Sequence, residues 1–281
     1  MISDKPKSAD AGPAFRERIS KGGILPLIGV YDVFSALIAA RRFEGVFCSG
    51  FSFAASAYGL PDLGFVNWRD IVDHSTRIRH ALPSTHILVD IDDGFGDEVV
   101  AANTVRTLES NGLSAVMLED QKRPRRCGHF QGKEVLPIEE YMVKLRAVLG
   151  QRKELFVIAR TDASDPEEGI DRCSAYAEAG ADGVMVEGIR DIKVAERLAA
   201  QVDCPVMVNQ LHGGNSPNWS LKELEEAGVA IAIYSTPCLF AAQYAIEQYL
   251  DEFRKSGRLP ATGTVELASC AEILNESINA S

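Results

Sequence analysis

Short apolar runs alternate with amphipathic stretches along most of the chain. Eight runs rich in Val, Ile, Leu and Ala occur at residues 24–31, 45–49, 86–92, 114–120, 155–161, 182–188, 204–210 and 229–234. Nearly continuous apolar character is typical of parallel strands that are buried on both faces. The stretches between them have helical periodicity, and two end at Gly112 and Gly180, where a helix C-terminus favours glycine. The pattern predicts a strand–helix unit repeated eight times.

Eight such units fit a (β/α)₈ barrel, an α/β fold of the TIM type that typically needs about 250 residues. The chain has 281 residues and no linker or low-complexity tract. A doubly wound sheet is the alternative, but eight evenly spaced units favour a closed barrel. We therefore expect a single domain over 1–281, with the barrel at about 24–256. A longer helix at 237–256 and a polar tail at 257–281 would complete it.

The composition narrows the class of partner. The chain is 46% hydrophobic, and 29 Lys and Arg against 40 Asp and Glu give a net charge of −11. This acidic balance argues against nucleic acid or an anionic membrane as a partner. No apolar stretch reaches the roughly 18 residues of a membrane span, and the N-terminus lacks the apolar core of a signal peptide. With six scattered cysteines and no CxxC pair, we expect a cytoplasmic protein with free thiols.

Polar side chains follow the predicted strands. In barrels of this type, functional groups gather at the C-terminal ends of the strands. Seven strands here end on such residues: Ser49 and Gly50, Asp90 and Asp92, Glu119 and Asp120, Arg160 and Asp162, Glu187, Asn209, and Ser235. One polar ending would mean little, because surface loops are polar anyway. Seven in register predict a site at this end of the barrel.

The acidic strand ends indicate a metal. Asp90 and Asp92 alternate on one strand, so both can point the same way, and Glu119 ends the neighbouring strand. Three carboxylates in a small volume are costly unless a cation neutralises them. Oxygen ligands without histidine favour Mg²⁺ or Mn²⁺ with waters completing the shell. Solvated loop acids or helix caps are the alternative that spacing alone leaves open.

A basic loop follows directly. The segment QKRPRRCGHFQGK carries five cations around Cys127 and His129: Lys122, Arg123, Arg125, Arg126 and Lys133. Such a loop beside an acidic metal site favours an anionic substrate, a carboxylate or a phosphonate. We expect its positive field to lower the pKa of Cys127. Gly128 and Gly132 would let the loop act as a lid. On composition alone, a solvated basic loop with an inert cysteine is the alternative.

These motifs resemble a known group of enzymes. The runs VDIDDGFGD, LEDQ, RRCGHFQGK and ARTDA resemble the isocitrate lyase and phosphoenolpyruvate mutase superfamily, with the closest likeness to the methylisocitrate and dimethylmalate lyase branch. SGFSFAASAYGLPDLG is similar to that branch's SGGG…GLPDLG segment, and NQLHGGNSP to its turn after the seventh strand. The likeness runs from about Gly29 to Pro217, and the Cys-Gly-His motif after two basic residues is its most specific part.

The resemblance implies a role for each matching position. Asp90 and Asp92 would bind Mg²⁺, one directly and one mainly through water, with Asp62 and Glu119 in the hydrated shell. Cys127 would be the thiol general acid, oriented by His129 and the basic loop. Arg160 would bind a substrate carboxylate. The implied substrate-binding positions are Ser49, Gly50, Arg125, Gly128, Glu187 and Asn209.

The sequence departs from the family pattern at three places in the site. Phe47 stands where the lyases commonly carry a tyrosine, so the usual candidate for deprotonating the substrate hydroxyl is lost. Tyr31 and Tyr58 are candidate replacements. SGGG becomes SGFS, which adds the bulk of Phe51, and His212 stands where the family often has glutamate. Phe47 and His212 lie among the predicted substrate contacts, so these changes favour an altered substrate or a different route to the enediolate.

The leading hypothesis is a Mg²⁺-dependent lyase that cleaves a 2-hydroxy di- or tricarboxylate, such as 2-methylisocitrate or 2,3-dimethylmalate, to an α-keto acid and a second carboxylate. One alternative is oxaloacetate hydrolysis or decarboxylation, or carboxyphosphonoenolpyruvate mutase chemistry, on the same fold. Another is a barrel that binds metal and ligand without turnover. The resemblance also implies a homotetramer that exchanges a C-terminal helix, although the segment after Tyr234 can equally be the barrel's own eighth helix.

Overall fold

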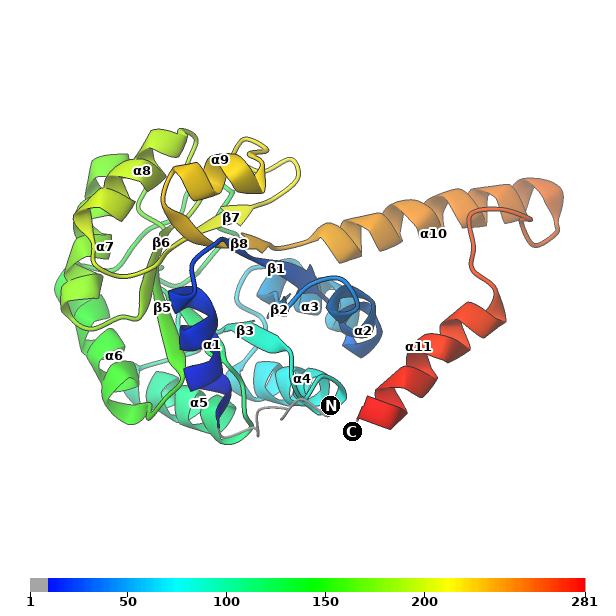
Figure 1. Ribbon diagram of the computed structural model, residues 1–281. Coiled ribbons are helices and arrows are strands. Elements are labelled where there is room, and N and C mark those ends of the chain that lie inside the picture. The colour runs from blue at the N-terminus through cyan, green and yellow to red at the C-terminus, as the bar shows by residue number, and fades with distance from the viewer. Residues whose placement is uncertain (1–9, 281) are drawn as a thin grey trace.

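The computed structural model describes residues 10–280 and shows a closed parallel barrel (Figure 1). Each strand pairs with the next along the chain, and β8 pairs with β1. This confirms the predicted TIM-type barrel and excludes the doubly wound sheet. All eight predicted runs contain a strand, within two residues of the expected ends: β1 Leu25–Val30, β2 Gly45–Cys48, β3 His86–Asp90, β4 Ala115–Glu119, β5 Phe156–Thr161, β6 Gly183–Val186, β7 Val206–Gln210 and β8 Val229–Tyr234.

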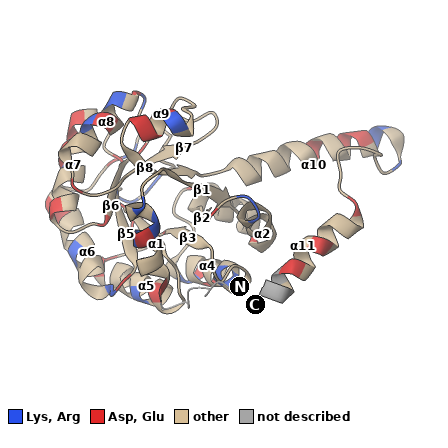
Figure 2. Cartoon of the chain, viewed as in Figure 1, with Lys and Arg blue, Asp and Glu red and all other residues tan. Residues whose placement is uncertain are grey.

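Helices surround the barrel (Figure 1). They are α2 Val33–Ala40, α4 Trp68–Ala81, α5 Glu98–Ser110, α6 Ile138–Gln151, α7 Pro166–Glu178, α8 Ile192–Gln201 and α9 Leu221–Glu226. Most begin at a side chain that accepts a hydrogen bond from the first turn, as Asp97 does for α5 and Asp165 for α7. Acidic and basic residues both occur along these outer helices (Figure 2).

The interior of the barrel is filled from its N-terminal end. Helix α1, Ala11–Ser20, lies there, and its fully buried Phe15 packs edge-on against Phe156 with the ring centroids 5.1 Å apart. Phe47, Leu88 and residues from the other strands complete this inner cluster. A second apolar cluster lies between the strands and the outer helices. The apolar filling leaves the C-terminal end of the barrel to the polar strand ends.

The chain after β8 forms two helices. Helix α10, Pro237–Ser256, matches the predicted long helix; it runs away from the barrel, and none of its residues is buried (Figure 1). The expected polar tail instead contains α11, Leu267–Ala280, in which Glu272 and Glu276 pair with Arg41 at the C-terminus of α2. Within residues 10–280, no helix combines the length and apolar character needed to cross a membrane.

Candidate active site

The polar strand ends meet at the C-terminal mouth of the barrel, as the sequence predicts. They line a small cavity of about 30 Å³. Its walls are Ser49, Phe51, Asp62, Asp90, Cys127, Gly128, His129, Arg160, Glu187, Asn209, Leu211, Ser235 and Thr236. Short helices α3, Gly50–Phe53, and η2, Ala54–Tyr58, follow β2, and the Ser49 hydroxyl caps α3 by accepting from the Ser52 N–H at 3.2 Å.

The basic loop covers this cavity. An antiparallel bridge between Gln121 and Val135 closes the base of the loop. The Lys133 ammonium donates to Asp162 Oδ1 at 2.9 Å and to the Gly128 carbonyl at 2.5 Å, which ties the loop to the end of β5. The small volume of the cavity therefore belongs to a closed loop, and a substrate must enter with the loop displaced.

Arg125 lies beneath the cavity rather than facing a substrate. Its guanidinium is buried and contacts three carboxylates: Glu119 at 2.8 Å, Asp92 at 3.3 Å, and Asp62. Arg125 is not among the residues that line the cavity. The substrate contact predicted for Arg125 is replaced by a structural one, because buried carboxylates need a cation close by.

Arg160 is the guanidinium that faces the cavity. Its Nε lies 2.9 Å from Asp162 Oδ2 and 3.5 Å from Glu187 Oε2, and Nη1 lies 3.3 Å from Glu119 Oε2. These carboxylates fix the planar fork at the end of β5. A fixed guanidinium fork suits a substrate carboxylate.

Asp90 and Asp92 lie together below the mouth. Asp90 accepts from the backbone N–H of Asp92 at 3.1 Å and of Gly50 at 3.4 Å. A Cβ atom at Gly50 would lie 3.2 Å from an oxygen of each aspartate, so glycine keeps this space clear. Asp92 has a left-handed backbone, φ 47°, and its buried Oδ1 has no hydrogen bond beyond the ion pair with Arg125 Nη2 at 3.3 Å. A strained backbone at a buried carboxylate is typical of functional positions.

The buried carboxylates are short of positive charge. Burial raises the pKa of Asp92 well above its usual value, against the opposing field of Arg125. Burial likewise raises the pKa of Glu119 to about 7. A hard divalent cation beside Asp90 and Asp92 would relieve this imbalance, and Mg²⁺ commonly takes only one or two carboxylates and keeps several waters. No group of three or more metal-binding side chains is assembled within the described chain. Asp62 and Glu119 both pair with Arg125, and their place in the hydrated metal shell stays a prediction.

The Cys127 thiol lines the cavity and is only 6% exposed. The prediction of a lowered pKa is wrong: burial, reinforced by Asp62, raises the pKa of Cys127 to about 12. Arg125 and Lys133 of the loop are paired with carboxylates, and among the main influences on this pKa only Arg160 and the backbone of His129 act to lower it. Cys127 is therefore a protonated thiol at neutral pH. That is the form in which it can donate a proton.

His129 is held by both ring nitrogens. Nδ1 accepts from the backbone N–H of Asn215 at 3.0 Å, which places the ring proton on Nε2, 3.0 Å from Glu187 Oε1. Glu187 also accepts from Asn209 Nδ2 at 3.2 Å, and Asn209 Oδ1 accepts from the Ser235 hydroxyl at 2.7 Å. One hydrogen-bonded wall thus runs across β6, β7 and β8. The positive charge of Arg160 and the contact with His129 hold the pKa of Glu187 below its usual range, although burial opposes this.

Other predicted positions lie elsewhere. Phe47 is buried in the inner apolar cluster and does not line the cavity, and His212 is exposed in a neighbouring pocket. Neither Tyr31 nor Tyr58 lines the cavity, and the Tyr58 hydroxyl donates to Asp70 at 3.0 Å. The predicted replacement for the family tyrosine is therefore not found. Asn215 was not predicted, because its contact with His129 exists only when the loop and the strand-seven turn meet.

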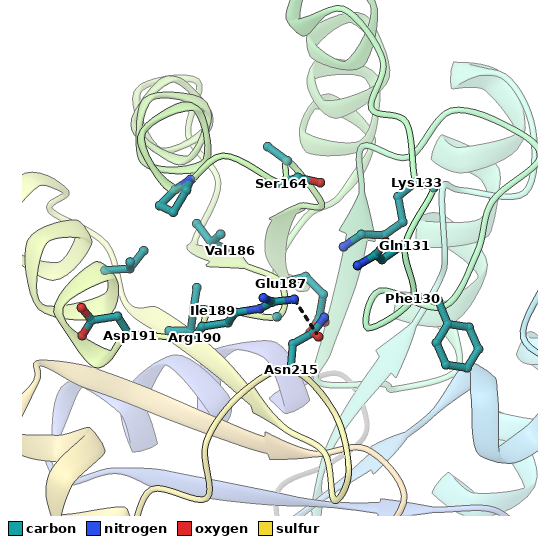
Figure 3. Close-up of a pocket in the computed structure, with 15 residues that line it drawn as sticks. Phe130, Gln131, Lys133, Ser164, Val186, Glu187, Ile189, Arg190, Asp191 and Asn215 are labelled. Atoms are coloured by element: carbon teal, nitrogen blue, oxygen red, sulfur yellow. Dashed lines mark hydrogen bonds between the residues drawn. The ribbon is translucent and has the colours of Figure 1, made fainter.

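Two larger pockets flank the cavity. The first, the loop pocket, holds about 510 Å³ between loop residues 130–133 and the ends of β5 and β6 (Figure 3). There Arg190 reaches Asn215 Oδ1 at 3.3 Å. The second, the side pocket, holds about 570 Å³ and is lined by Gln210, Leu211, His212, Gly213, Ser216, Asn218, Tyr234, Thr236, Pro237 and Phe240.

Comparison with known proteins places this geometry in a family. Residues 15–254 match the family described as phosphoenolpyruvate phosphomutase. The chain is 33% identical to a 2-methylisocitrate lyase of Bacillus subtilis over 92% of this chain and 86% of that protein. A structure of oxaloacetate acetylhydrolase with 3,3-difluorooxalacetate superposes with a TM-score of 0.92 at 28% identity, covering 98% of this chain and 97% of the other. A 2,3-dimethylmalate lyase structure gives 0.90 at 28%, covering 98% and 94%. The chain belongs to the phosphoenolpyruvate mutase and isocitrate lyase superfamily of enzymes.

Proposed function

We propose that the protein is a Mg²⁺-dependent carbon–carbon lyase that cleaves a 2-hydroxy di- or tricarboxylate to an α-keto acid and a second carboxylate. The observation that carries this proposal is the placement of a protonated thiol, Cys127, in the same cavity as Arg160 and Asp90. The relatives named as 2-methylisocitrate lyase and 2,3-dimethylmalate lyase support the same reaction class.

Each residue of the cavity has a task in this reaction. Arg160 binds the carboxylate of the departing fragment and stabilises the negative charge that develops there. Asp90 and Asp92 would hold Mg²⁺, which when bound would supply the Lewis-acid chemistry that acidifies the substrate hydroxyl. Ser49 closes the wall beside Asp90. After the hydroxyl has released its proton to solvent, the carbon–carbon bond breaks and that oxygen becomes the keto oxygen. The electron pair stays on the departing carbon, and the Cys127 thiol gives its proton to that carbon and becomes a thiolate.

His129 positions the loop that carries Cys127 and does not itself react with the substrate. Its ring is held between the Asn215 backbone and Glu187, and Cys127 lies two residues before it in the same loop. The Lys133 contacts to Asp162 and Gly128 fasten that loop. The thiol is thereby placed over the substrate only when the loop is closed, which keeps water away from the carbanion.

The test is keto-acid release, trapped as a hydrazone, with and without Mg²⁺. The panel is 2-methylisocitrate, isocitrate, 2,3-dimethylmalate and oxaloacetate, with wild type, Cys127→Ser and the control Cys270→Ser in α11. Mg²⁺-dependent release from a hydroxy acid that Cys127→Ser loses and Cys270→Ser keeps would support the proposal. The absence of keto-acid release from every hydroxy acid would refute the proposal.

Oxaloacetate hydrolysis is the second candidate. Phe47 offers no proton acceptor, and no tyrosine lines the cavity, so the tyrosine that the resemblance implies as the base is not found there. The likeness to the structure of oxaloacetate acetylhydrolase favours the same candidate. Consumption of oxaloacetate without any cleavage of hydroxy acids would select it.

We also infer that the protein is a homo-oligomer, a tetramer in its assembled form. Helix α10 carries exposed apolar side chains, among them Ile246 at 56% and Leu250 at 58%, and extends away from its own barrel (Figure 1). An apolar helix face of this kind is stable in water only when something covers it. A second copy of the chain, offering the same face, is the occupant we propose.

A further inference from the structure

We propose that the side pocket selects the substrate: it accepts an uncharged substituent and excludes a third carboxylate. The inference rests on the lyase function proposed above and narrows its substrate class to 2-hydroxy dicarboxylates, of the 2,3-dimethylmalate kind. Three observations carry it. The side pocket has an uncharged lining, few cations face the cavity, and the Glu187 carboxylate lies between the cavity and the loop pocket.

The side pocket adjoins the cavity through Leu211 and Thr236, which line both. Phe51 of the cavity wall packs edge-on against Phe240 of the side pocket, with ring centroids 6.1 Å apart. A substituent that extends from the reacting carbons in this direction therefore passes an aliphatic and two aromatic side chains. These surfaces favour a methyl or other uncharged group.

No lysine, arginine, aspartate or glutamate lines the side pocket. His212 is exposed to solvent, and the polar groups deeper in the pocket are neutral: Gln210 Nε2 and Ser216 Oγ have no hydrogen-bond partner in the described structure. These neutral donors can serve a hydroxyl or a carbonyl. A carboxylate placed there would meet neutral donors but no arginine or lysine, so its transfer from water costs more than that of a methyl, hydroxyl or carbonyl group.

The cavity itself can hold only two carboxylates. Arg160 is the single arginine or lysine among its lining residues, and the metal beside Asp90 and Asp92 would take the carboxylate next to the hydroxyl. Arg125 and Lys133 do not line the cavity, and the ring of His129, which does, is held by Asn215 and Glu187. A tricarboxylate therefore has one carboxylate more than the site has cations.

The third carboxylate cannot be bound in the loop pocket either. It contains Arg190, whose guanidinium turns toward Asn215 (Figure 3). The only lining residue that the loop pocket shares with the cavity is Glu187. The Glu187 carboxylate, fixed by His129 and Asn209, repels an anion at this boundary.

The experiment compares kcat/KM for 2,3-dimethylmalate and 2-methylisocitrate with Mg²⁺ in wild type and Phe240→Arg. We expect wild type to prefer the dicarboxylate by at least about 100-fold, since a carboxylate left without a partner is so costly to bury. Phe240→Arg adds a cation to the side pocket and should narrow that preference at least about tenfold. Val99→Arg, at an apolar side chain 68% exposed on α5, is the matched control and should leave the preference unchanged.

A binding measurement separates failure of this inference from failure of the lyase function. Calorimetry with Mg²⁺ compares 2-methylsuccinate with propane-1,2,3-tricarboxylate, neither of which needs turnover. Tighter binding of the dicarboxylate, reversed or narrowed in Phe240→Arg, supports the inference even if no hydroxy acid is cleaved. Equal cleavage of both substrates, or tighter binding of the tricarboxylate by wild type, overturns it and leaves the lyase proposal standing.

Discussion

Gly128 lies so close to Arg160 that no side chain fits between them. A Cβ atom at position 128 would overlap Nη2 of Arg160 and Cγ of Glu187, and it would lie 3.0 Å from Asp162 Oδ1. All three neighbours are buried at the strand ends. The glycine after Cys127 is therefore needed to let the loop close onto the guanidinium.

Gly128→Ala should lower kcat/KM by at least about 100-fold, because displacing a substrate-binding group by about 1 Å can cost that much. The control is Gly150→Ala in α6, where an added Cβ meets nothing within 4 Å. That change should keep the activity and raise the free energy of unfolding by up to about 1 kcal/mol. Steady-state kinetics and urea denaturation of both variants test this, and full activity in Gly128→Ala would contradict the closed arrangement.

Cys127 should react slowly with alkylating reagents despite its basic loop. Its pKa of about 12 and its burial leave very little thiolate at pH 8. Cys270 in α11 is less buried and provides an internal comparison. Mass spectrometry after a timed iodoacetamide pulse should find Cys270 labelled well before Cys127. Faster labelling of Cys127 would mean that the loop opens widely or that the thiolate is stabilised after all.

His74 should make the fold acid-sensitive. Its ring stacks on Phe53 with centroids 4.1 Å apart, Nε2 has no hydrogen-bond partner, and burial, aided by Arg77, lowers the pKa to about 4. The unfolded chain binds this proton near pH 6.5, so protonation favours unfolding as the pH falls below that value. The contribution is complete above pH 6.5 and is lost between there and about pH 4.

Protonation of His74 should lower the free energy of unfolding by about 3 kcal/mol, since its pKa falls from 6.5 to about 4 and each pKa unit corresponds to about 1.4 kcal/mol. His74→Phe should remove it, so that the free energy of unfolding falls less steeply between pH 7 and pH 4.5. His80→Phe, at an exposed position of the same helix, should leave the slope as in wild type. Urea denaturation at several pH values measures all three proteins, and identical slopes would show that His74 is accommodated in its charged form.

The sequence predicts the barrel well because parallel strands buried on both faces need continuous apolar runs. The rule that strand ends carry function likewise brings Asp90, Arg160 and Glu187 into one cavity, as the structure shows. These features depend on the local pattern of apolar residues and on the order of the strands, and both can be predicted from a single sequence.

The features that the sequence misjudges depend on which side chain meets which. Arg125 looks like a substrate ligand until the fold surrounds it with Glu119, Asp92 and Asp62. The same pairing removes the field that was expected to lower the pKa of Cys127. The role of Asn215 cannot be recognised from the sequence because its partner, His129, is 86 residues away. Burial and pairing of this kind are set only by the tertiary structure.

Helix α10 provides the last prediction, on assembly. Ile246, Leu250 and Phe253 are spaced at i, i+4 and i+7, so they form one exposed apolar face of the helix. If that face binds a second copy, the double variant Ile246→Asp, Leu250→Asp should lower the molar mass found by light scattering from the assembled form toward that of one chain. Each Å² of apolar surface that is no longer buried between the two copies should weaken their association by about 25 cal/mol.

Gln248→Asp is the control, because it adds a negative charge to the opposite face of α10 and should keep the assembled mass. Circular dichroism separates lost assembly from lost folding, since the barrel does not need α10 for its core. An unchanged mass in the double variant would show that α10 is not the contact. A wild-type protein that is already a single chain at micromolar concentration would refute the oligomer itself.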